Sequence, residues 1–527
     1  MDFTPSTVVN VLNVPLNLSN KNQIDFENTT AQASYFSSCL VRSFTDFTYQ
    51  RKDNIIRVPV NAEHLYNCNY VMYKNDNFSD KWFYAYITKI EYLNPECTAL
   101  HIKTDVFQTW FYDCTFRPSF IVRETVLDDS LFKHTIPENI ESGEKIVQSI
   151  DTTSEADIRS HDFLNFDETF YCVVAMSEPA SWWQGFEVPP LDNFMSGLPN
   201  CCYFYAMSRD VLYNFFHELN QAGQAGAVVS CVAIPKCFVE YHQMPFENVG
   251  YITDIATPPE GFTKSIAKNL TSLNGYIPKN KKCFCYPYNF VILSNNCGAS
   301  TLLKYELFDD KEGDMIFNTW YTAGTAPCLT SVPRDYNGVH LDFNYSIAYN
   351  NFPELAWKYD SYANWLALNK NSLAMSYIAK GIGMAGNIAS ANIPGVLSDT
   401  IGIASDLASM ADRSKVPEQY KGQVSPNVPL QADRANCFVY QYCCRAEYAQ
   451  IVDEYFSRFG YLVNEVKKPN LKNRVNWDYI QTRAVDISGS VPNDDMLELC
   501  SLFDSGLTIW HNTATYGDYG TANPTVL

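Results

Sequence analysis

The stretch FVYQYCCRAEYAQIVDEYFSRFGYLVNEV, residues 438–466, carries the clearest fold signal in this chain. Its first seven residues are rich in aromatic side chains, which predict a strand. Apolar side chains then recur at helical spacing, and Gly460 follows them, where helices commonly end. The helical stripe consists of Tyr448, Ile451, Val452, Tyr455, Phe456 and Phe459. Because YLVNEV predicts another strand, the stretch is interpreted as strand, helix, strand.

Residues 467–511 extend this pattern towards the C-terminus. The turn KKPNLKN precedes a predicted strand over 475–487, and a short helix is expected from Pro492 to Phe503. Pro492 suits a helix start, and the acidic Asp494 and Asp495 complement the helix dipole there. A last strand, LTIWH, completes the order βαββαβ, which is that of a split ferredoxin-like unit.

The region before residue 127 predicts an antiparallel sheet. The runs IIRVPV, YNCNYVMY, KWFYAYITKIEY, TALHIKTDVFQTWFYD and SFIVRETV are dense in strand-forming residues, and polar or proline-containing turns separate them. Leu100 and Ile102 alternate with His101 and Lys103, so one face of that strand is expected to be buried.

The middle of the chain alternates strand-like runs with loops rich in proline and glycine. TFYCVVAM, AVVSCVAI and NFVILS predict strands, and one helix is expected from Arg209 to Asn220. A further helix is expected after Pro353, running into an uncharged segment that Pro394-Gly395 should break. The fold class is therefore mainly β with α+β parts. The predicted domains are an N-terminal β domain (1–127), a β-rich middle (128–350), a helical segment (351–427) and a C-terminal α+β domain (428–527).

Composition excludes several functional classes. The net charge of -20 argues against a surface that grips nucleic acid, since phosphate binding needs clustered Lys and Arg. Solubility explains such acidity, although a wall past which DNA slides without sticking would also need it. The seventeen cysteines contain no CxxC pair, which predicts reduced thiols rather than a metal site. The start of the chain is acidic and interrupted, unlike a signal peptide, so the chain is expected to fold where it is made.

No pattern in the sequence predicts catalysis, a metal or a cofactor. GxSxG and GxxxxGK[ST] motifs are missing, and His217-Glu218 lacks a second zinc ligand four residues after the histidine. The acidic pairs at residues 128–129, 309–310 and 494–495 are adjacent, and neighbouring side chains diverge in both helices and strands. A non-enzymatic protein is therefore expected.

An apolar segment stands out in this acidic chain. Residues 381–398 carry no charge, and the wider segment 371–411 carries only Lys380, Asp399 and Asp406. Eighteen helical residues span about 27 Å, close to a bilayer's hydrocarbon thickness. Its asparagines, glycines and Pro394 make it too weakly apolar for a permanent single span. A buried helical hairpin is the alternative interpretation.

Four motifs together resemble one known family. KWFYAYITKIEY (81–92), DVFQTWFYDCTFRPSFIVRE (105–124), VKKPNL (466–471) and FDSGLTIWH (503–511) are similar, in this order, to the distal tail knob proteins of small short-tailed phages of the phi-twenty-nine type. The resemblance implies a hexameric, hub-like tube at the distal end of the virion tail, made in the host cytoplasm. It also implies that the hairpins of 82–125 pack with the C-terminal domain as the tube wall.

The family carries an apolar insert before its C-terminal domain, and 371–411 occupies that place. By resemblance, this insert plugs the lumen and later penetrates the host membrane so that DNA can enter. The implied partners are other copies of the chain, lower collar or tail tube proteins, tail tip or plug proteins, the host membrane, and passing DNA without sequence-specific binding. The implied membrane-active residues are Ile378, Ile382, Met384, Ile388, Ile393, Pro394, Gly395, Val396, Leu397, Ile401, Ile403 and Leu407.

Two other functions fit the same residues. A tail hub or receptor adaptor would use the insert only as core. A cell-wall-degrading tail enzyme would need one of the carboxylate pairs.

Overall fold

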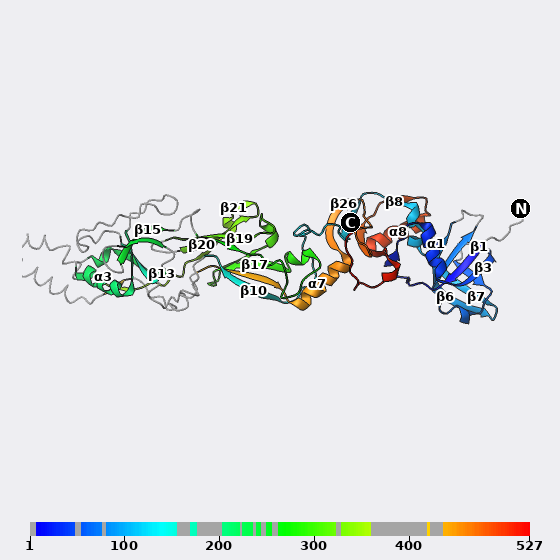
Figure 1. Ribbon diagram of the computed structural model, residues 1–527, viewed down its shortest axis with the longest axis horizontal. Coiled ribbons are helices and arrows are strands. Elements are labelled where there is room, and N and C mark those ends of the chain that lie inside the picture. Colours follow the sequence, from blue (N-terminus) through cyan, green and yellow to red (C-terminus); the bar gives the residue numbers. More distant parts are fainter. Residues whose placement is uncertain are drawn as a thin grey trace, which may run out of the picture. The chain divides into compact units, whose positions relative to one another are not determined.

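Two compact units make up the chain, and each contains segments that are distant in sequence. Unit 1 consists of Met1–Lys145, Thr271–Tyr288 and Cys444–Leu527; unit 2 consists of Ile146–Leu270 and Asn289–Cys443. The domains predicted from the sequence, in contrast, were each a single continuous stretch. The computed structural model (Figure 1) describes residues 7–19, 21–47, 54–75, 81–154, 169–175, 203–221, 224–235, 239–243, 249–255, 262–322, 328–359, 419–421 and 436–526.

A six-stranded sheet in unit 1 has the order β3-β1-β5-β6-β7-β4, and all neighbours are antiparallel. This confirms the predicted antiparallel hairpins. Leu100 and Ile102 are buried and Lys103 is exposed, so the predicted one-sided burial is also confirmed. The strands are β1 (Thr7–Leu12), β3 (Leu40–Phe47), β4 (Ile55–Val58), β5 (Tyr70–Asn75), β6 (Phe83–Asn94) and β7 (Cys97–Thr104).

Both faces of this sheet are packed. Successive side chains of a strand point to opposite faces, and apolar side chains on each face contribute to a separate core. One core contains Val9, Val11 and Ile56. The other contains Tyr70 and Tyr84 together with Phe36 of α1 (Thr29–Ser38) and the C-terminal Trp477 and Trp510. The N-terminal sheet therefore depends on side chains from the other end of the chain.

A second sheet in unit 1 mixes strands from both ends of the chain in the order β2-β29-β27-β9-β26. β9 pairs on one side with β26 and on the other with β27, both antiparallel. The N-terminal and C-terminal regions therefore pack together, as the resemblance implied. The elements are β2 (Asn22–Ile24), β9 (Ser119–Glu124), α7 (Ala446–Phe459), β26 (Tyr461–Lys467), β27 (Trp477–Arg483), α8 (Asn493–Ser505) and β29 (Leu507–Trp510), beside the small pair β8 (Cys114–Phe116) and β28 (Ile487–Gly489).

Two sequence predictions for the C-terminal and N-terminal regions differ from the structure. The expected ferredoxin-like sheet does not form, because β25 (Phe438–Cys444) pairs with β17 (Asn289–Ser294) instead of joining β26, β27 and β29. Stacking of Phe290 on Tyr442, with ring centroids 5.5 Å apart, supports that pairing. The run DVFQTWFYD, predicted as strand, forms α2 (Val106–Trp110) and a 3-10 turn, because the Asp105 side chain caps the helix by accepting from the Gln108 N–H.

The described part of unit 2 contains three larger sheets, with the orders β10-β25-β17-β18, β13-β11-β12-β15-β14 and β16-β19-β20-β21, and β22 pairs with β20. The predicted helix is present as α3 (Arg209–Gln221). The strands are β10 (Lys145–Thr152), β11 (Thr169–Ala175), β12 (Tyr203–Met207), β13 (Val228–Pro235), β14 (Val239–Gln243), β15 (Val249–Ile255), β16 (Phe262–Ile266), β18 (Ser300–Leu303), β19 (Met315–Thr322), β20 (Cys328–Tyr336), β21 (Val339–Leu341) and β22 (Ile347–Tyr349).

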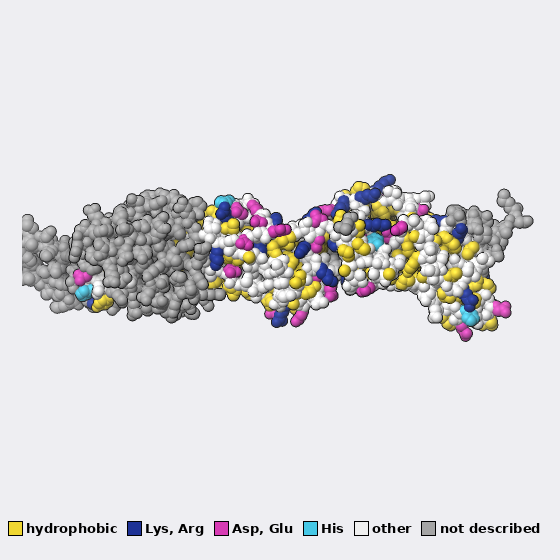
Figure 2. Space-filling view, viewed as in Figure 1, with side chains coloured by type: hydrophobic (Ala, Val, Ile, Leu, Met, Phe, Trp, Pro, Cys, Tyr) yellow, Lys and Arg dark blue, Asp and Glu magenta, His cyan; other side chains and the backbone are white. Residues whose placement is uncertain are grey.

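The surface of the described residues mixes charge signs. Acidic and basic side chains are interspersed with apolar ones over the face that Figure 2 shows. Such mixing is typical of a soluble surface and gives no extended basic area on that face.

Candidate functional site at the base of the apolar insert

The predicted membrane-active residues, from Ile378 to Leu407, lie outside the described residues. The structure instead describes two short strands that lie before and after this segment in the chain. These are β23 (Trp357–Tyr359) and β24 (Gln419–Lys421), both in unit 2. The predicted helix after Pro353 is therefore wrong for residues 357–359, which form a strand.

β23 and β24 pair with each other as a two-stranded antiparallel ribbon. Trp357 lies opposite Lys421, and Tyr359 lies opposite Gln419. The Lys421 ammonium lies 4.3 Å from the centre of the Tyr359 ring, a cation–π contact across the two strands. Tyr359 and Gln419, the described residues on either side of 360–418, therefore lie opposite each other.

Backbone and ring contacts fix this ribbon to the rest of unit 2. The segment before β23 runs beside β13, where the Leu355 N–H donates to the Cys231 carbonyl at 2.9 Å. Trp357 is 5% exposed and stacks on Phe216 of α3, with ring centroids 5.7 Å apart. The Asn220 side-chain amide donates to the Lys358 carbonyl at 2.9 Å. The base of the insert is thus part of the packed fold.

A cavity of about 590 Å³ lies beside the ribbon, between α3 and β23. Its walls are mostly aromatic and apolar, and the buried Trp357 indole N–H has no hydrogen-bond partner among the residues that the structure describes. Tyr213 at its rim is 76% exposed and stacks parallel to His217. The lining residues are Leu212, Tyr213, Phe216, His217, Asn220, Cys231, Leu355, Ala356, Trp357 and Lys358.

The adjacent carboxylates Asp128 and Asp129 contact different partners. Divergence of neighbouring side chains was predicted from their spacing. Asp128 is exposed, and its hydrogen bond with Lys133 (2.5 Å) lowers the pKa of its carboxyl group. Asp129 accepts from the Tyr461 hydroxyl at 2.7 Å, and burial raises its pKa. The two side chains therefore do not converge on one reacting bond.

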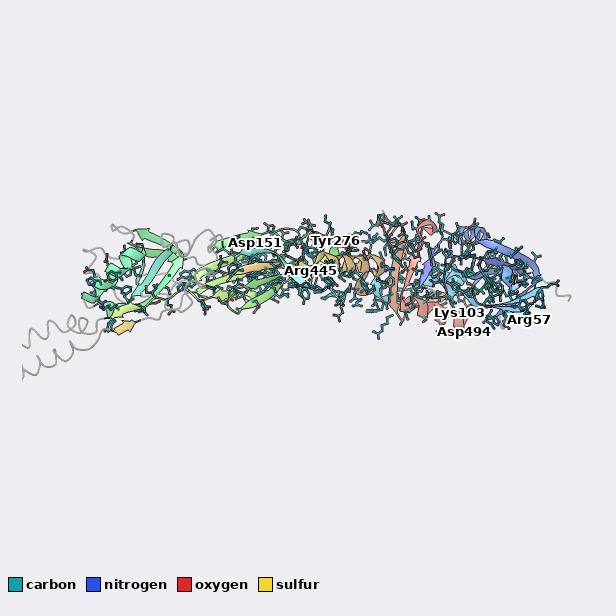
Figure 3. The ribbon with its side chains drawn as sticks, turned by 90° about the horizontal axis from the view of Figure 1, so that it is seen from below. Arg57, Lys103, Asp151, Tyr276, Arg445 and Asp494 are labelled. Atoms are coloured by element: carbon teal, nitrogen blue, oxygen red, sulfur yellow. The ribbon has the colours of Figure 1, made fainter. Side chains whose placement is uncertain are left out.

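The second acidic pair separates in the same way. Asp495 is buried and accepts from the Trp110 indole N–H at 2.7 Å. Asp494 is exposed, and Figure 3 shows it at the surface near Lys103. Within the described ranges, no three His, Cys, Asp or Glu side chains gather as metal ligands.

Among the helices that the structure describes, none is both long and apolar enough to cross a bilayer.

Comparison with known protein families shows to which family the chain belongs. Residues 254–524 match the C-terminal domain of the tail knob protein gp9 of Bacillus phage phi29. The chain belongs to this tail knob family. Residues 4–115 separately match the N-terminus of caudoviral major tail proteins. This second match covers the six-stranded sheet of the tail knob chain.

Relatives of the tail knob family cover nearly the whole chain. The tail knob protein gp9 of Bacillus phage PZA is 26% identical over 99% of this chain and 100% of that protein. The phi29 protein is 23% identical over 99% and 100%. The tail knob protein gp12 of bacteriophage C1 has a similar fold, with a TM-score of 0.66 at 15% identity over 99% of this chain and all of that one. This chain is therefore a component of a phage virion tail.

The sequence alone does not predict the ribbon of β23 and β24. The predicted helical segment, 351–427, covers both strands, because three residues are too few to show a period. Aromatic residues in both segments, WKY and QYK, were the only local signal.

Proposed function

We propose that this tail knob chain forms the tube at the distal tail tip, and that its apolar insert, 371–411, plugs the tube and later penetrates the host membrane. Genome ejection would then use the opened tube. The tail-protein match over 4–115 and the knob match over 254–524 support the tube. The proposed role needs no catalytic residue and no cofactor.

The observation that carries the membrane step is the paired base of the insert. β23 and β24 bring residues 359 and 419 together, and the excursion between them contains a 41-residue segment with only three charged side chains. A loop whose ends are held by the fold can change its surroundings while the strands around it keep their pairing. Such a segment can be stored in one environment and released into another.

The composition of the insert supports a metastable element. Gly, Ala and Ser dominate it, and small residues allow helices to pack closely within lipid. Asn387, Asn392 and Pro394 lower its affinity for hydrocarbon, since polar groups are expensive there. Several copies released together would share those polar groups in a bundle, which a single copy cannot do.

Release of dye from liposomes tests this proposal directly. The intact protein is expected to release dye at neutral or mildly acidic pH, whereas a variant lacking residues 375–411 is not. The deletion spares β23 and β24, so the base can still pair. Equal leakage from both proteins would contradict the membrane step.

A pair of point variants separates apolarity from general damage. Ile393→Asn with Leu397→Asn makes two apolar positions polar and is expected to reduce leakage strongly. The matched control, Asn392→Gln with Ser398→Asn, changes two neighbouring positions that are already polar and should leak like the intact protein. A control that loses as much activity as the test variant would show that apolarity is not the cause.

The tube itself is tested by its assembly. A ring of identical subunits is expected, with six copies by resemblance, and it would join tail tube or lower collar proteins in the virion. Sedimentation or native mass measurement of the insert-deleted protein should still give this ring. A strictly monomeric protein at high concentration would contradict the tube.

A further inference from the structure

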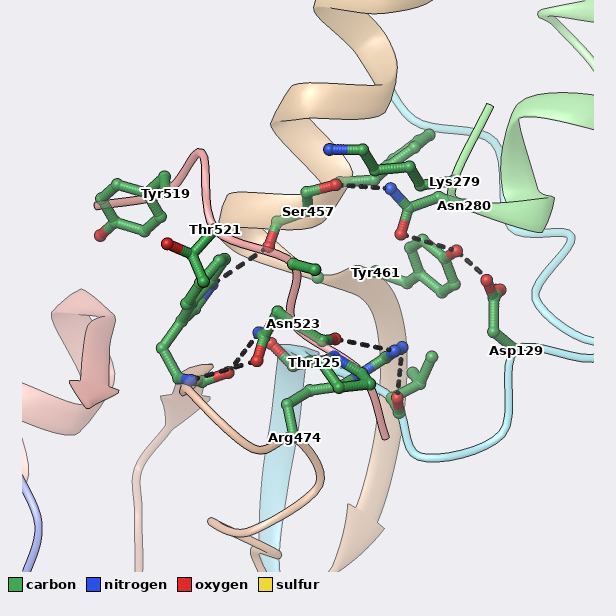
Figure 4. A pocket seen from close by; sticks show the side chains of 16 residues that line it. Thr125, Asp129, Lys279, Asn280, Ser457, Tyr461, Arg474, Tyr519, Thr521 and Asn523 are labelled. Carbon is green, nitrogen blue, oxygen red and sulfur yellow. Dashed lines mark hydrogen bonds between the residues drawn. The ribbon is translucent and has the colours of Figure 1, made fainter. Parts of the chain in front are cut away.

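A cavity of about 310 Å³ in unit 1 lies away from the insert base and is lined by five separate chain segments. Figure 4 shows Lys279 and Ser457 on one side of it, Arg474 and Thr125 on the opposite side, and Tyr519 and Asp129 at its two flanks. Cavities of this size with a few polar groups and aromatic walls are typical of small-molecule sites. All its lining residues belong to unit 1.

Arg474 is the main charged group of this cavity. Its Nη2 donates to the Val126 carbonyl at 3.0 Å, and its Nη1 lies 3.5 Å from the Asn523 carbonyl. The Nε is buried and has no acceptor, and within the described residues Arg474 forms no ion pair. Two backbone carbonyls thus hold the guanidinium, and the Nε–H remains without an acceptor among the described residues. Burial raises the pKa of Asp129, and the nearby Arg474 charge partly opposes that rise.

The remaining free groups of the cavity are mainly donors. The Ser457 hydroxyl accepts from the Asn280 amide, and the Thr125 hydroxyl accepts from the Tyr479 N–H, so each keeps its own proton to donate. The exposed Lys279 ammonium contacts no carboxylate among the described residues. The hydrogen-bond donors lie on two sides of the cavity. A phosphate, whose acceptor oxygens point in several directions, fits this arrangement better than a planar carboxylate does.

One carboxylate also lines the cavity. Asp129 accepts from the Tyr461 hydroxyl at 2.7 Å and from the Lys281 N–H at 3.0 Å. A carboxylate with two oxygens can accept further hydrogen bonds, and a hydroxyl group of a ligand would supply one. The aromatic rings of Trp477 and Tyr519 form the wall between the charged groups.

We propose that this cavity binds a small phosphate ester that carries hydroxyl groups, with its phosphate at Arg474 and a hydroxyl at Asp129. The proposal does not depend on the membrane step, because it rests only on unit 1. No other copy of the chain and no metal ion is required.

Calorimetric titration of the full-length protein at neutral pH tests the site with glycerol 3-phosphate, inorganic phosphate and acetate as probes. Affinity is expected to decrease in that order. Arg474→Gln is expected to weaken glycerol 3-phosphate about tenfold or more, since it removes a charged donor. The matched control is Arg57→Gln, which removes the same charge from the exposed face of β4 (Figure 3) and should leave binding within about twofold.

A second variant guards against loss of folding, because Arg474 also holds backbone carbonyls. Lys279 is exposed and its ammonium forms no ion pair with any described residue, so Lys279→Gln should fold normally and weaken binding about two- to fivefold. Lys468→Gln is its exposed control. The proposal is overturned by absence of saturable binding, by equal affinity of each variant and its control, or by acetate binding as tightly as the phosphates. Equal binding of inorganic phosphate and glycerol 3-phosphate would overturn the hydroxyl contact at Asp129.

Discussion

Gly460 joins α7 to β26 in a backbone conformation that almost only glycine adopts, with φ 63° and ψ -155°. A Cβ at this position would also collide with the backbone carbonyl of Glu124 in β9. Gly460→Ala is therefore expected to lower the free energy of unfolding by about 2 kcal/mol or more, from strain and from displacement of β9 together. Thermal or denaturant unfolding of the full chain measures this.

The control for that variant separates strain from collision. Gly275 in unit 1 also has a positive φ, 86°, but a Cβ there would meet no atom within 4 Å. Gly275→Ala should therefore lower the free energy of unfolding only through backbone strain, by about 1 kcal/mol. Equal losses from the two variants would show that β9 does not press on Gly460.

His511 lies between two buried carboxylates in unit 1. Its Nε2 is 3.1 Å from Asp478 and its Nδ1 is 3.5 Å from Asp25. Burial by itself would lower the pKa of His511, but the contacts with the two carboxylates outweigh it and raise the pKa to about 9. Because this folded value exceeds the unfolded value of 6.5, the charged imidazolium stabilises the fold fully below about pH 6.5.

That stabilisation is lost as the pH rises through about 9. The shift corresponds to about 3 kcal/mol of stability, given about 1.4 kcal/mol per pKa unit. The difference in unfolding free energy between the intact protein and His511→Gln should therefore shrink between pH 6.5 and 9.5. His64→Gln, at an exposed position, should show no such trend. A constant difference for His511→Gln across this range would rule out the raised pKa.

Glu138 connects three chain segments of unit 1. Its carboxylate pairs with Arg123 of β9 and with Lys282, and it accepts from the Leu462 N–H of β26 at 3.0 Å. The side chains of Glu138 and Lys282 are each 2% exposed. Burial lowers the pKa of Lys282, and Glu138 opposes that effect. This buried ion cluster holds elements together that local sequence does not connect.

Removing the negative charge of Glu138 should therefore lower the free energy of unfolding considerably. Glu138→Gln leaves two buried cations without a counter-charge and is expected to cost about 3–5 kcal/mol. The matched control is Glu498→Gln, whose partner Lys103 is 48% exposed, and it should cost less than about 1 kcal/mol. Urea unfolding of both variants measures the difference, and similar midpoints would argue against the cluster as a joint.

Local periodicity predicted the elements of this fold better than their partners. α3 and α7 were predicted correctly because their apolar stripes lie within one helix, and the strands before residue 127 because their turns are short. The partner of β25 could not be read from the sequence, since β17 lies more than a hundred residues away. The run at 106–113 was misread because a single cap, Asp105, overrode strand propensity.

The arrangement of the chain in two units explains why site prediction stopped at the insert. Unit 1 is assembled from three segments, so the cavity at Arg474 combines residues from 125 to 524 that no sequence window contains. The segment 371–411, in contrast, is continuous in sequence, so its scarcity of charge is evident from composition alone. A composite site of this kind cannot be assembled from sequence windows, whereas the role of segment 371–411 stays a prediction.

The net charge of the whole molecule gives the last prediction, which concerns DNA. With 58 acidic and 38 basic side chains the chain carries -20, and association with DNA depends on the counterions that Lys and Arg release from phosphates. We therefore expect no binding of duplex DNA at about 100 mM salt, as the proposed passage of a genome through a tube requires. Gel retardation across a salt series measures this. Binding that weakens steeply as salt increases would reveal a basic surface and contradict the proposed passage.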